Sequence, residues 1–372
     1  MNIVIDARLN AYRNGGIPAY TRQLSTALAH IAPQHHFTIL QHRRQPERIV
    51  SAPNVSRRVI YTPPHHPLEQ WILPIEVAAT RPTVALFPDF VAPLRRTFPA
   101  VVTIHDLAFL YFDDLLDDAA RAYYGQVGSS AQRADGIIAV SQSTKTDIMH
   151  FFGIAAERIH VIYEAAHPQF TPLPHIAHER RRINEHDITA QSYVLFVSTI
   201  EPRKNIPVLL HALRICRDRH PHRNYHLVLA GARGWRETPI LALIDQLRLH
   251  EAVTLLGAVN DADLHWLYAN SRIYVNPSRY EGFGLPLIEA LACGAPALAS
   301  NSSSLPEVGG DACMYLPVDD PGAWADMIET VWADEHLRQQ MATRGPRQAA
   351  NFSWQRCAEQ TLELLQAVSP TT

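Results

Sequence analysis

Short apolar runs rich in valine and isoleucine alternate with helical patterns along this sequence, and that alternation is its strongest constraint. The runs fall into two series. The first comprises residues 3–6, 37–40, 58–61, 84–88, 100–106 and 136–141, and the second comprises residues 193–199, 224–231, 252–257, 272–277 and 295–300. Strands that are apolar on both sides are typical of parallel sheets with helices on both faces. The pattern therefore predicts an α/β protein of two doubly wound, Rossmann-like domains facing one another.

The domain boundary is expected between the two series. A chain of 372 residues is too long for one ordinary core. The stretch 166–191 is rich in proline, histidine and charge, which indicates a linker. We expect an N-terminal domain over residues 1–185 and a C-terminal domain over residues 186–353. A final helical pattern over residues 354–368 follows a segment in which no strand is expected.

Composition excludes several classes of protein. The formal net charge of −3 gives no basis for non-specific nucleic-acid binding. The four cysteines lie far apart without metal-ligand spacing, which is typical of reduced thiols in a cytoplasmic protein. Asp6 and Arg8 interrupt the first apolar run, so it is not a signal peptide. No run approaches the roughly 20 apolar residues of a membrane helix.

The stretch SRYEGFGLPLIEALACG, residues 278–294, combines two carboxylates with a glycine turn and a helix start. Gly282 and Gly284 allow the backbone to approach a ligand, and the free N–H groups of the following helix favour phosphate. Glu281 and Glu289 can accept hydrogen bonds from sugar hydroxyls on either side of that phosphate. The arrangement indicates a nucleotide-sugar site. The alternative is that both glutamates only cap and solvate a helix.

Three further groups follow expected strands. Arg203 and Lys204 come after the first strand of the second series, where open α/β sheets bind ligands, and they suit a diphosphate leaving group. Gly15-Gly16 follows the first strand of the chain and forms the same kind of anion turn. His105 ends an internal strand, where it is either a satisfied half-buried residue or part of a site.

These blocks resemble the GT4 family of retaining glycosyltransferases, which have the two-domain GT-B fold. The resemblance runs from about residue 3 to residue 365 and rests on EGFGLPLIEALACGAPALAS, STIEPRKN, NGGIPAYTRQL, TIHDL and FSW. It implies that the final helix crosses back onto the N-terminal domain. The implied catalytic residues are His105, Arg203, Lys204 and Glu281. The implied donor-binding residues are Gly15, Gly16, Ser198, Gly282, Phe283, Gly284, Leu285 and Glu289.

The resemblance also assigns roles to these residues. It implies that Glu281 contacts the donor sugar, Glu289 the ribose, Arg203 and Lys204 the diphosphate, and His105 the sugar near its reacting carbon. Many members have Gly-Arg where this chain has Ser198-Thr199. The STIEPRKN form resembles a bacterial subgroup of mannosyl- and rhamnosyltransferases of surface-polysaccharide assembly, which favours GDP-mannose as the donor and a glycan or lipid-linked saccharide as the acceptor.

The resemblance implies transfer with retention, in which the departing phosphate helps to deprotonate the acceptor. No DxD motif occupies a plausible metal site, so we expect no metal and no cofactor besides the nucleotide-sugar co-substrate. The alternatives are an epimerase or hydrolase on the same fold, or a non-catalytic nucleotide-sugar-binding protein. A dinucleotide oxidoreductase would need GxGxxG after the first strand, which NGGIPAY does not supply. The N-terminal arginines between residues 43 and 58 indicate either peripheral contact with the inner membrane face or a scattered solvated surface.

Overall fold

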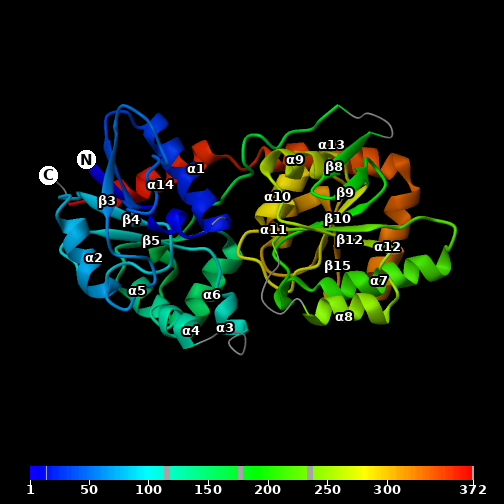
Figure 1. Cartoon of the computed structure of the whole chain (residues 1–372). Coiled ribbons are helices and arrows are strands. Elements are labelled where there is room, and N and C mark those ends of the chain that lie inside the picture. The colour runs from blue at the N-terminus through cyan, green and yellow to red at the C-terminus, as the bar shows by residue number, and fades with distance from the viewer. Residues whose placement is uncertain (14, 113–117, 175–178, 233–237, 371–372) are drawn as a thin grey trace. The chain divides into compact units, whose positions relative to one another are not determined.

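The computed structural model describes residues 1–13, 15–112, 118–174, 179–232 and 238–370. The chain divides into two compact units (Figure 1). Unit 1 comprises Met1–Glu164 and Phe352–Thr372, and unit 2 comprises Ala165–Asn351. The first crossing between units therefore lies earlier than the expected boundary at residue 185. The sequence 166–191 belongs to unit 2 rather than to a linker between the units.

Unit 1 contains a sheet of seven parallel strands in the order β3-β2-β1-β4-β5-β6-β7. The strands are β1 Asn2–Asp6, β2 His36–His42, β3 Val55–Ile60, β4 Val84–Phe87, β5 Ala100–Ile104, β6 Gly136–Ala139 and β7 Ile159–Val161. β4, β5 and β6 are buried along their whole length, as strands covered on both faces must be. Because all strands are parallel, their carboxyl ends share one edge of the sheet.

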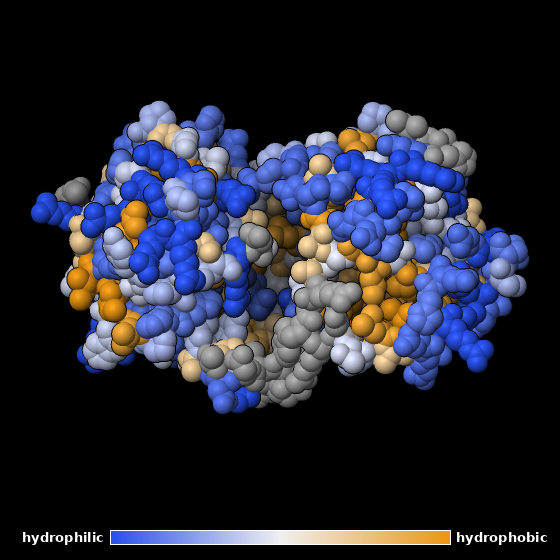
Figure 2. Space-filling view, viewed as in Figure 1, coloured by the Kyte–Doolittle hydropathy of each residue, from blue (hydrophilic) through white to orange (hydrophobic). Residues whose placement is uncertain are grey.

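Helices cover both faces of this sheet. They are α1 Gly16–Ile31, α2 Glu69–Ala78, α3 Ala108–Tyr111, α4 Asp118–Tyr124, α5 Val127–Arg133, α6 Gln142–Phe152 and α14 Trp354–Ala367, with short 3-10 turns at Arg8–Ala11 and Ala156–Arg158. α2, α5 and α6 pack on one face, and α14 packs beside α1 on the other. Leu73 and Val77 of α2 face the core, whereas its opposite side is apolar and exposed (Figure 2).

Unit 2 contains a second parallel sheet, of six strands in the order β12-β11-β10-β13-β14-β15. The strands are β10 Val194–Val197, β11 Leu227–Ala230, β12 Val253–Gly257, β13 Ile273–Asn276, β14 Ala297–Ser300 and β15 Cys313–Leu316. An antiparallel hairpin, β8 Arg180–Ile183 and β9 His186–Thr189, precedes it. Two Rossmann-like parallel sheets are the architecture that the alternating runs predicted.

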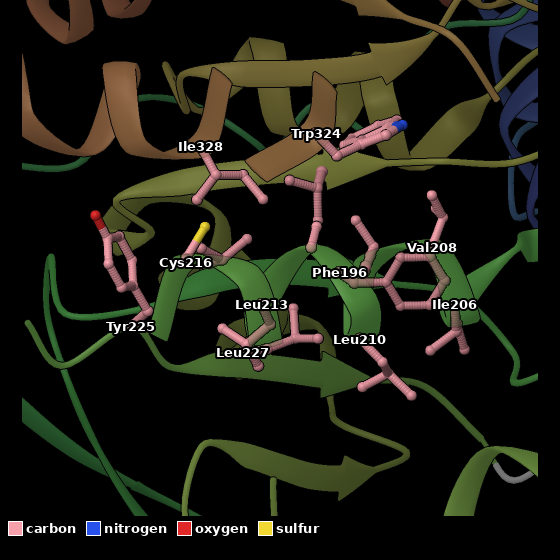
Figure 3. Packing of buried hydrophobic residues seen from close by; sticks show 14 of the residues in the cluster. Phe196, Ile206, Val208, Leu210, Leu213, Cys216, Tyr225, Leu227, Trp324 and Ile328 are labelled. Carbon is pink, nitrogen blue, oxygen red and sulfur yellow. The ribbon is translucent and has the colours of Figure 1, made fainter. Parts of the chain in front are cut away.

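The helices of unit 2 are α7 Ile206–Arg219, α8 Thr238–Gln246, α9 Asp261–Asn270, α10 Leu285–Ala292, α11 Leu305–Gly309, α12 Pro321–Ala333 and α13 Glu335–Ala349, with 3-10 turns at Pro202–Lys204 and Gly310–Ala312. α7 packs against α12. Leu213 and Cys216 of α7 lie beside Trp324 and Ile328 of α12, with Phe196 of β10 next to them (Figure 3). Trp324 is fully buried, and this layer holds the central strand in place.

Three strand features differ from expectation: the three-residue strand β7, the hairpin β8–β9 and the strand β15. The hairpin β8–β9 lies in the stretch interpreted as a linker. Only Ile183 and Ile188 of its eight residues are buried, so arginine and other polar residues hide the pattern. Asn184 has φ 53°, a conformation that asparagine tolerates and that suits a tight turn. β15 lies in the segment where no strand was expected, because this edge strand reads CMYL, without valine or isoleucine, and its two middle residues are only half-buried.

All four cysteines, Cys216, Cys293, Cys313 and Cys357, are free and buried. Burial raises the pKa of each thiol, to about 12 for Cys216, where the Glu329 carboxylate adds to the effect. The thiols are therefore protonated packing groups, in agreement with the sequence-based prediction of reduced, buried cysteines.

Candidate active site

Two loops of unit 2 meet at the carboxyl ends of the neighbouring strands β10 and β13. The loop after β10 carries Arg203 and Lys204, and the loop after β13 carries Glu281. Lys204 Nζ donates to Glu281 Oε1 at 2.7 Å and to Oε2 at 2.9 Å. Ser278 Oγ donates to Glu281 Oε1 at 2.7 Å. The Glu281 carboxylate is thus held by two donors from different loops.

Arg203 completes this group. Its Nη1 lies 3.3 Å from Glu281 Oε2 and donates to the carbonyl of Tyr280 at 3.2 Å. Its Nε lies 2.7 Å from Glu201 Oε1. The side chain of Arg203 remains 22% exposed, whereas those of Lys204 and Glu281 are 7% and 9% exposed. Solvent therefore reaches Arg203 more easily than Lys204.

Electrostatics keep the Glu281 carboxylate ionised. Burial alone would raise the pKa of Glu281, but the charges of Lys204 and Arg203 and the hydrogen bonds from Lys204 and Ser278 lower it to about 2. Burial and the neighbouring guanidinium of Arg203 lower the pKa of Lys204. Two cations thus surround one carboxylate in a site largely withdrawn from water. Such a group can exchange its carboxylate partner for an anionic ligand.

Helix α10 begins at Leu285, after the glycine turn that follows Glu281. Gly284 precedes its first residue with φ 101°, a conformation that favours glycine, and Pro286 lies in its first turn. Gly294 follows the helix with φ 77°, as predicted for its end. Ser304 Oγ donates to the carbonyls of Glu281, at 3.0 Å, and Phe283, at 2.9 Å. The glycine turn is therefore fixed in front of the N-terminus of α10.

Glu289 lies one turn inside α10, half-buried, and its Oε2 accepts a hydrogen bond from the Tyr268 hydroxyl at 3.0 Å. Leu285, the first residue of α10, and Phe283 flank the turn. The predicted pair Glu281 and Glu289 is thus divided by the glycine turn. One carboxylate faces the cations and the other faces a tyrosine.

Ser198 lies at the end of β10, where its N–H donates to the carbonyl of Ala230 at 3.0 Å. The neighbouring Gly231 has φ 146°, and a Cβ at Gly231 would meet the Ser198 carbonyl oxygen at 2.0 Å. Only glycine fits this approach of the two strand ends. Sequence reasoning did not single out Gly231, although it ends an expected strand.

In unit 1, Gly15 and Gly16 form the start of α1. Gly15 has φ 132° and precedes the helix, and Gly16 is its first residue. Both are exposed, and a Cβ at Gly15 would meet no atom within 4 Å. Glycine at position 15 therefore allows a backbone conformation that other residues rarely adopt, and the space beside it, before the helix N-terminus, is open.

His105 follows β5 and is buried between two acceptors. Its Nδ1 lies 2.8 Å from Glu164 Oε1, and its Nε2 lies 2.8 Å from the carbonyl oxygen of Pro88. The Pro88 carbonyl can only accept, and the Glu164 carboxylate accepts when ionised, so this geometry suits an imidazolium that donates from both ring nitrogens. Burial opposes that charge, but the hydrogen bond and charge of Glu164 raise the pKa of His105. A ring nitrogen of His105 could contact a sugar hydroxyl only if its hydrogen bond to Glu164 or to the Pro88 carbonyl were broken.

A second ionic group of unit 1 was missed from the sequence. Arg8 lies within hydrogen-bonding distance of Asp6, at 2.7 Å, and of Glu69, at 2.5 Å. Asp6 ends β1 and Arg8 follows it, whereas Glu69 is the first residue of α2. Burial opposes the charge of Arg8, but the two carboxylates more than offset it and raise its pKa. Asp6 and Arg8 were noted only as interruptions of an apolar run. Their position at the end of β1 was the signal that could have identified them.

Asp89 follows β4 in the same way. Its Oδ2 lies 2.8 Å from His65 Nε2, and the ring of His65 stacks on Tyr123 with centroids 3.7 Å apart. Burial raises the pKa of Asp89, but the hydrogen bond and charge of His65 outweigh burial, so that the pKa is lowered. The strand-end position that drew attention to His105 applies equally to Asp89.

The structure therefore brings Arg203, Lys204 and Glu281 into direct contact and places Glu289 and the glycine turn beside them within unit 2. His105, Gly15 and Gly16 belong to unit 1. Sequence reasoning did not identify several residues that contact these groups, namely Glu164, Glu201, Tyr268, Ser278 and Ser304. Ser278 could have been found from its place beside Glu281, whereas Glu164 follows β7, a strand too short to predict.

Within the ranges that the structure describes, no three histidine, cysteine or acidic side chains lie close enough together to hold a metal ion. Asp113, Asp114 and Asp117, which the sequence favours as part of a solvated acidic face rather than a metal site, lie outside those ranges. No helix of the same described residues is both long and apolar enough to cross a membrane.

Two glycosyltransferase family models match this chain, one in each part of the sequence. A family model described as glycosyl transferases group 1 matches residues 179–348, and one described as glycosyltransferase family 4 matches residues 14–170. The O-antigen chain mannosyltransferase B of Escherichia coli is 34% identical over 276 residues, which cover 74% of this chain and 72% of that protein.

Two further matches differ in extent. The serotype-specific mannosyltransferase WbdA of Escherichia coli is 32% identical over 71% of this chain, and the match covers 33% of that protein. The structure of sucrose-phosphate synthase from Thermosynechococcus elongatus matches with a TM-score of 0.78 and 21% identity, over 99% of this chain and 98% of that one. The match to this structure supports the arrangement of the fold.

Proposed function

Because this chain belongs to the GT4-type glycosyltransferases with the GT-B fold, we propose that it transfers mannose from GDP-mannose, with retention, to a glycan or lipid-linked saccharide. The observation that carries the choice of sugar is the 34% identity with the O-antigen chain mannosyltransferase B of Escherichia coli. The match to a second mannosyltransferase supports the same choice.

Arg203 and Lys204 are proposed to bind the diphosphate of the donor. Lys204, which is buried, and Arg203, which is half-buried, lie at the carboxyl edge of a parallel sheet, where such folds bind nucleotides. A diphosphate would take over part of the pairing that Glu281 now supplies. The charge that develops on the leaving group as the glycosidic bond breaks would then be stabilised by groups already in place.

Glu281, once its cations are shared with the diphosphate, can accept hydrogen bonds from hydroxyls of the donor sugar. Glu289 lies across the glycine turn and is proposed to accept from the ribose hydroxyls. In the transfer step, the bond between the anomeric carbon and the diphosphate breaks. The acceptor hydroxyl attacks from the same face and its proton passes to the departing phosphate oxygen.

His105 is proposed to lie near the sugar at the reacting carbon. As an imidazolium held by Glu164 and Pro88, its ring cannot act as a general base, because both nitrogens then carry protons. Its contribution would be a fixed positive charge or a hydrogen bond gained by exchange of the Pro88 carbonyl. Gly15 and Gly16 are proposed to close over phosphate and acceptor through backbone N–H groups.

The proposal is tested by calorimetric titration of the whole chain with GDP, UDP and ADP, followed by turnover of the matching mannosyl donor. Tightest binding of GDP and release of GDP only in the presence of a saccharide acceptor are expected. Release at the same rate without acceptor would indicate a hydrolase. Binding of the nucleotide without turnover of any donor would indicate a binding protein.

A further inference from the structure

Helix α2 of unit 1 is apolar on two sides. Leu73 and Val77 face the core. Leu68, Trp71, Ile72 and Ile75 recur at helical spacing on the other side, and Tyr61 lies beside them because its N–H donates to Glu76 of the helix at 2.9 Å. We call these five exposed residues the α2 face. A helix that is apolar all round is normally buried, whereas this one meets solvent.

Exposure is concentrated on the α2 face. Ile75 is 71%, Tyr61 67% and Trp71 65% exposed, and these are the three most exposed large apolar side chains of the described residues. Hydrophobic residues gather at the edge of the view where Figure 1 places α2 (Figure 2). Scattered exposed apolar residues are ordinary, but a contiguous group on one helix indicates a binding surface.

Arginines accompany the aromatic rings of this surface. The guanidinium of Arg95 lies 5.9 Å from the centre of the Trp71 ring, and that of Arg43 lies 6.0 Å from the centre of the Tyr61 ring. Of the two acids of α2, Glu69 is buried, whereas Glu76 is half-exposed beside Tyr61. Glu69 pairs with Arg8, and Glu76 accepts from the backbone of Tyr61. The α2 face therefore combines apolar side chains with positive charge.

We propose that the α2 face binds a membrane surface that contains anionic lipid. Tryptophan and tyrosine favour the boundary between lipid tails and headgroups, and aliphatic side chains favour the tails. The adjacent arginines complement anionic headgroups. A second copy of the chain would instead bring a rim of the same charge to both sides of the contact, which opposes association. This proposal does not rest on the transfer reaction.

The test is sedimentation of the whole chain with phosphatidylcholine vesicles, with and without phosphatidylglycerol. Wild-type protein is expected to sediment with anionic vesicles at low salt and to be released by salt. Trp71→Ser combined with Ile75→Ser should lower the partition coefficient by about tenfold or more. The matched control is Met149→Ser, which removes an exposed apolar residue of α6 in the same unit.

Charge is tested separately, so that a folding defect of the α2 variant does not decide the result. Arg43→Glu combined with Arg95→Glu should weaken binding to anionic vesicles about fivefold or more, whereas Arg344→Glu, on α13 of unit 2, should not. GDP binding should be unchanged in all these variants. Equal sedimentation of wild-type protein with both vesicles, or loss of a lipid-free dimer in the α2 variant, would overturn the proposal.

Discussion

Two buried glutamates, Glu69 in unit 1 and Glu281 in unit 2, are almost equally withdrawn from water, at 6% and 7% exposure, yet their pKa values move in opposite directions. Burial raises the pKa of Glu69, and Arg8 compensates only in part because Asp6 shares that cation. Glu281 faces two cations, and its pKa falls to about 2. The ratio of cations to carboxylates, rather than burial, decides the state of each group.

This difference separates a group that holds structure from one that can receive a ligand. In unit 1, one cation serves two carboxylates, so an additional anion would be repelled. In unit 2, two cations, Lys204 and Arg203, serve Glu281, and Arg203 also pairs with Glu201, so an incoming diphosphate would take over pairing that these carboxylates now supply. Five experiments test this difference between the two units.

The largest effect is expected on removal of the shared cation of unit 1. Arg8→Met leaves Asp6 and Glu69 without a cation, and breaking such a buried pair costs about 3–5 kcal/mol of unfolding free energy. Urea denaturation of the variant and of wild-type protein measures this difference. Glu69→Gln, which leaves Arg8 paired with Asp6, is the milder control. An Arg8→Met protein as stable as wild type would show that the group contributes nothing to the fold.

The two glutamates should also respond oppositely to acid. The folded pKa of Glu281, about 2, lies below its ordinary value of 4.5. Its contribution, about 3 kcal/mol, is therefore present above pH 4.5 and lost as the pH falls toward 2. The raised pKa of Glu69 means that its unit gains stability as the pH falls through that pKa toward 4.5.

Pulsed hydrogen exchange in urea, followed peptide by peptide, resolves the two units in this pH experiment. Glu281→Gln should flatten the acid-induced loss in unit 2, and Glu69→Gln should remove the opposite slope in unit 1. The same slope in both units, or no change in either variant, would refute the assignment of opposite charge environments.

The cations of unit 2 should matter for ligand binding. Lys204→Ala and Arg203→Ala are each expected to weaken binding of the nucleoside diphosphate and slow transfer, by about 1.5–3 kcal/mol for a charged hydrogen bond. Calorimetry and turnover measure the two effects. Arg279→Ala is the matched control, since that guanidinium pairs with Asp319. Unchanged affinity and rate in both test variants would exclude the proposed diphosphate site.

A smaller effect should distinguish the two carboxylates of unit 2. Glu289→Ala is expected to weaken binding of free nucleotide by about 1 kcal/mol, because the proposed ribose contact is lost. Glu281→Ala should retain nucleotide affinity and lose turnover, because its proposed partner is the donor sugar. Identical nucleotide affinities of the two variants would show that this division of roles is wrong.

No effect at all is expected from chelation. Lys204 and Arg203 supply positive charge at the proposed diphosphate site, so transfer should continue in EDTA at the rate seen without it. The measurement is turnover with and without EDTA, and again after addition of magnesium or manganese. Activity that is abolished by EDTA and restored by either metal would contradict the predicted metal independence.

The sequence predicted the architecture because uniformly apolar strands leave a clear pattern, whereas the short β7, the partly buried β15 and the polar hairpin β8–β9 do not. It also predicted that Glu281, Arg203 and Lys204 belong to one site, since all follow parallel strands. Their direct pairing was not predicted, because the approach of two loops depends on tertiary packing. Glu164 was missed for the same reason, as its partner His105 lies far away in the sequence.

Alkylation of the four buried thiols can report the stability of each unit separately. A protonated, enclosed thiol reacts with an alkylating reagent only when its surroundings open, so its reaction rate reports the free energy of that opening. Cys216, Cys293 and Cys313 lie in unit 2, whereas Cys357 lies on α14 of unit 1. Cys357 therefore acts as a native reporter of the moment when the last helix leaves the sheet it covers.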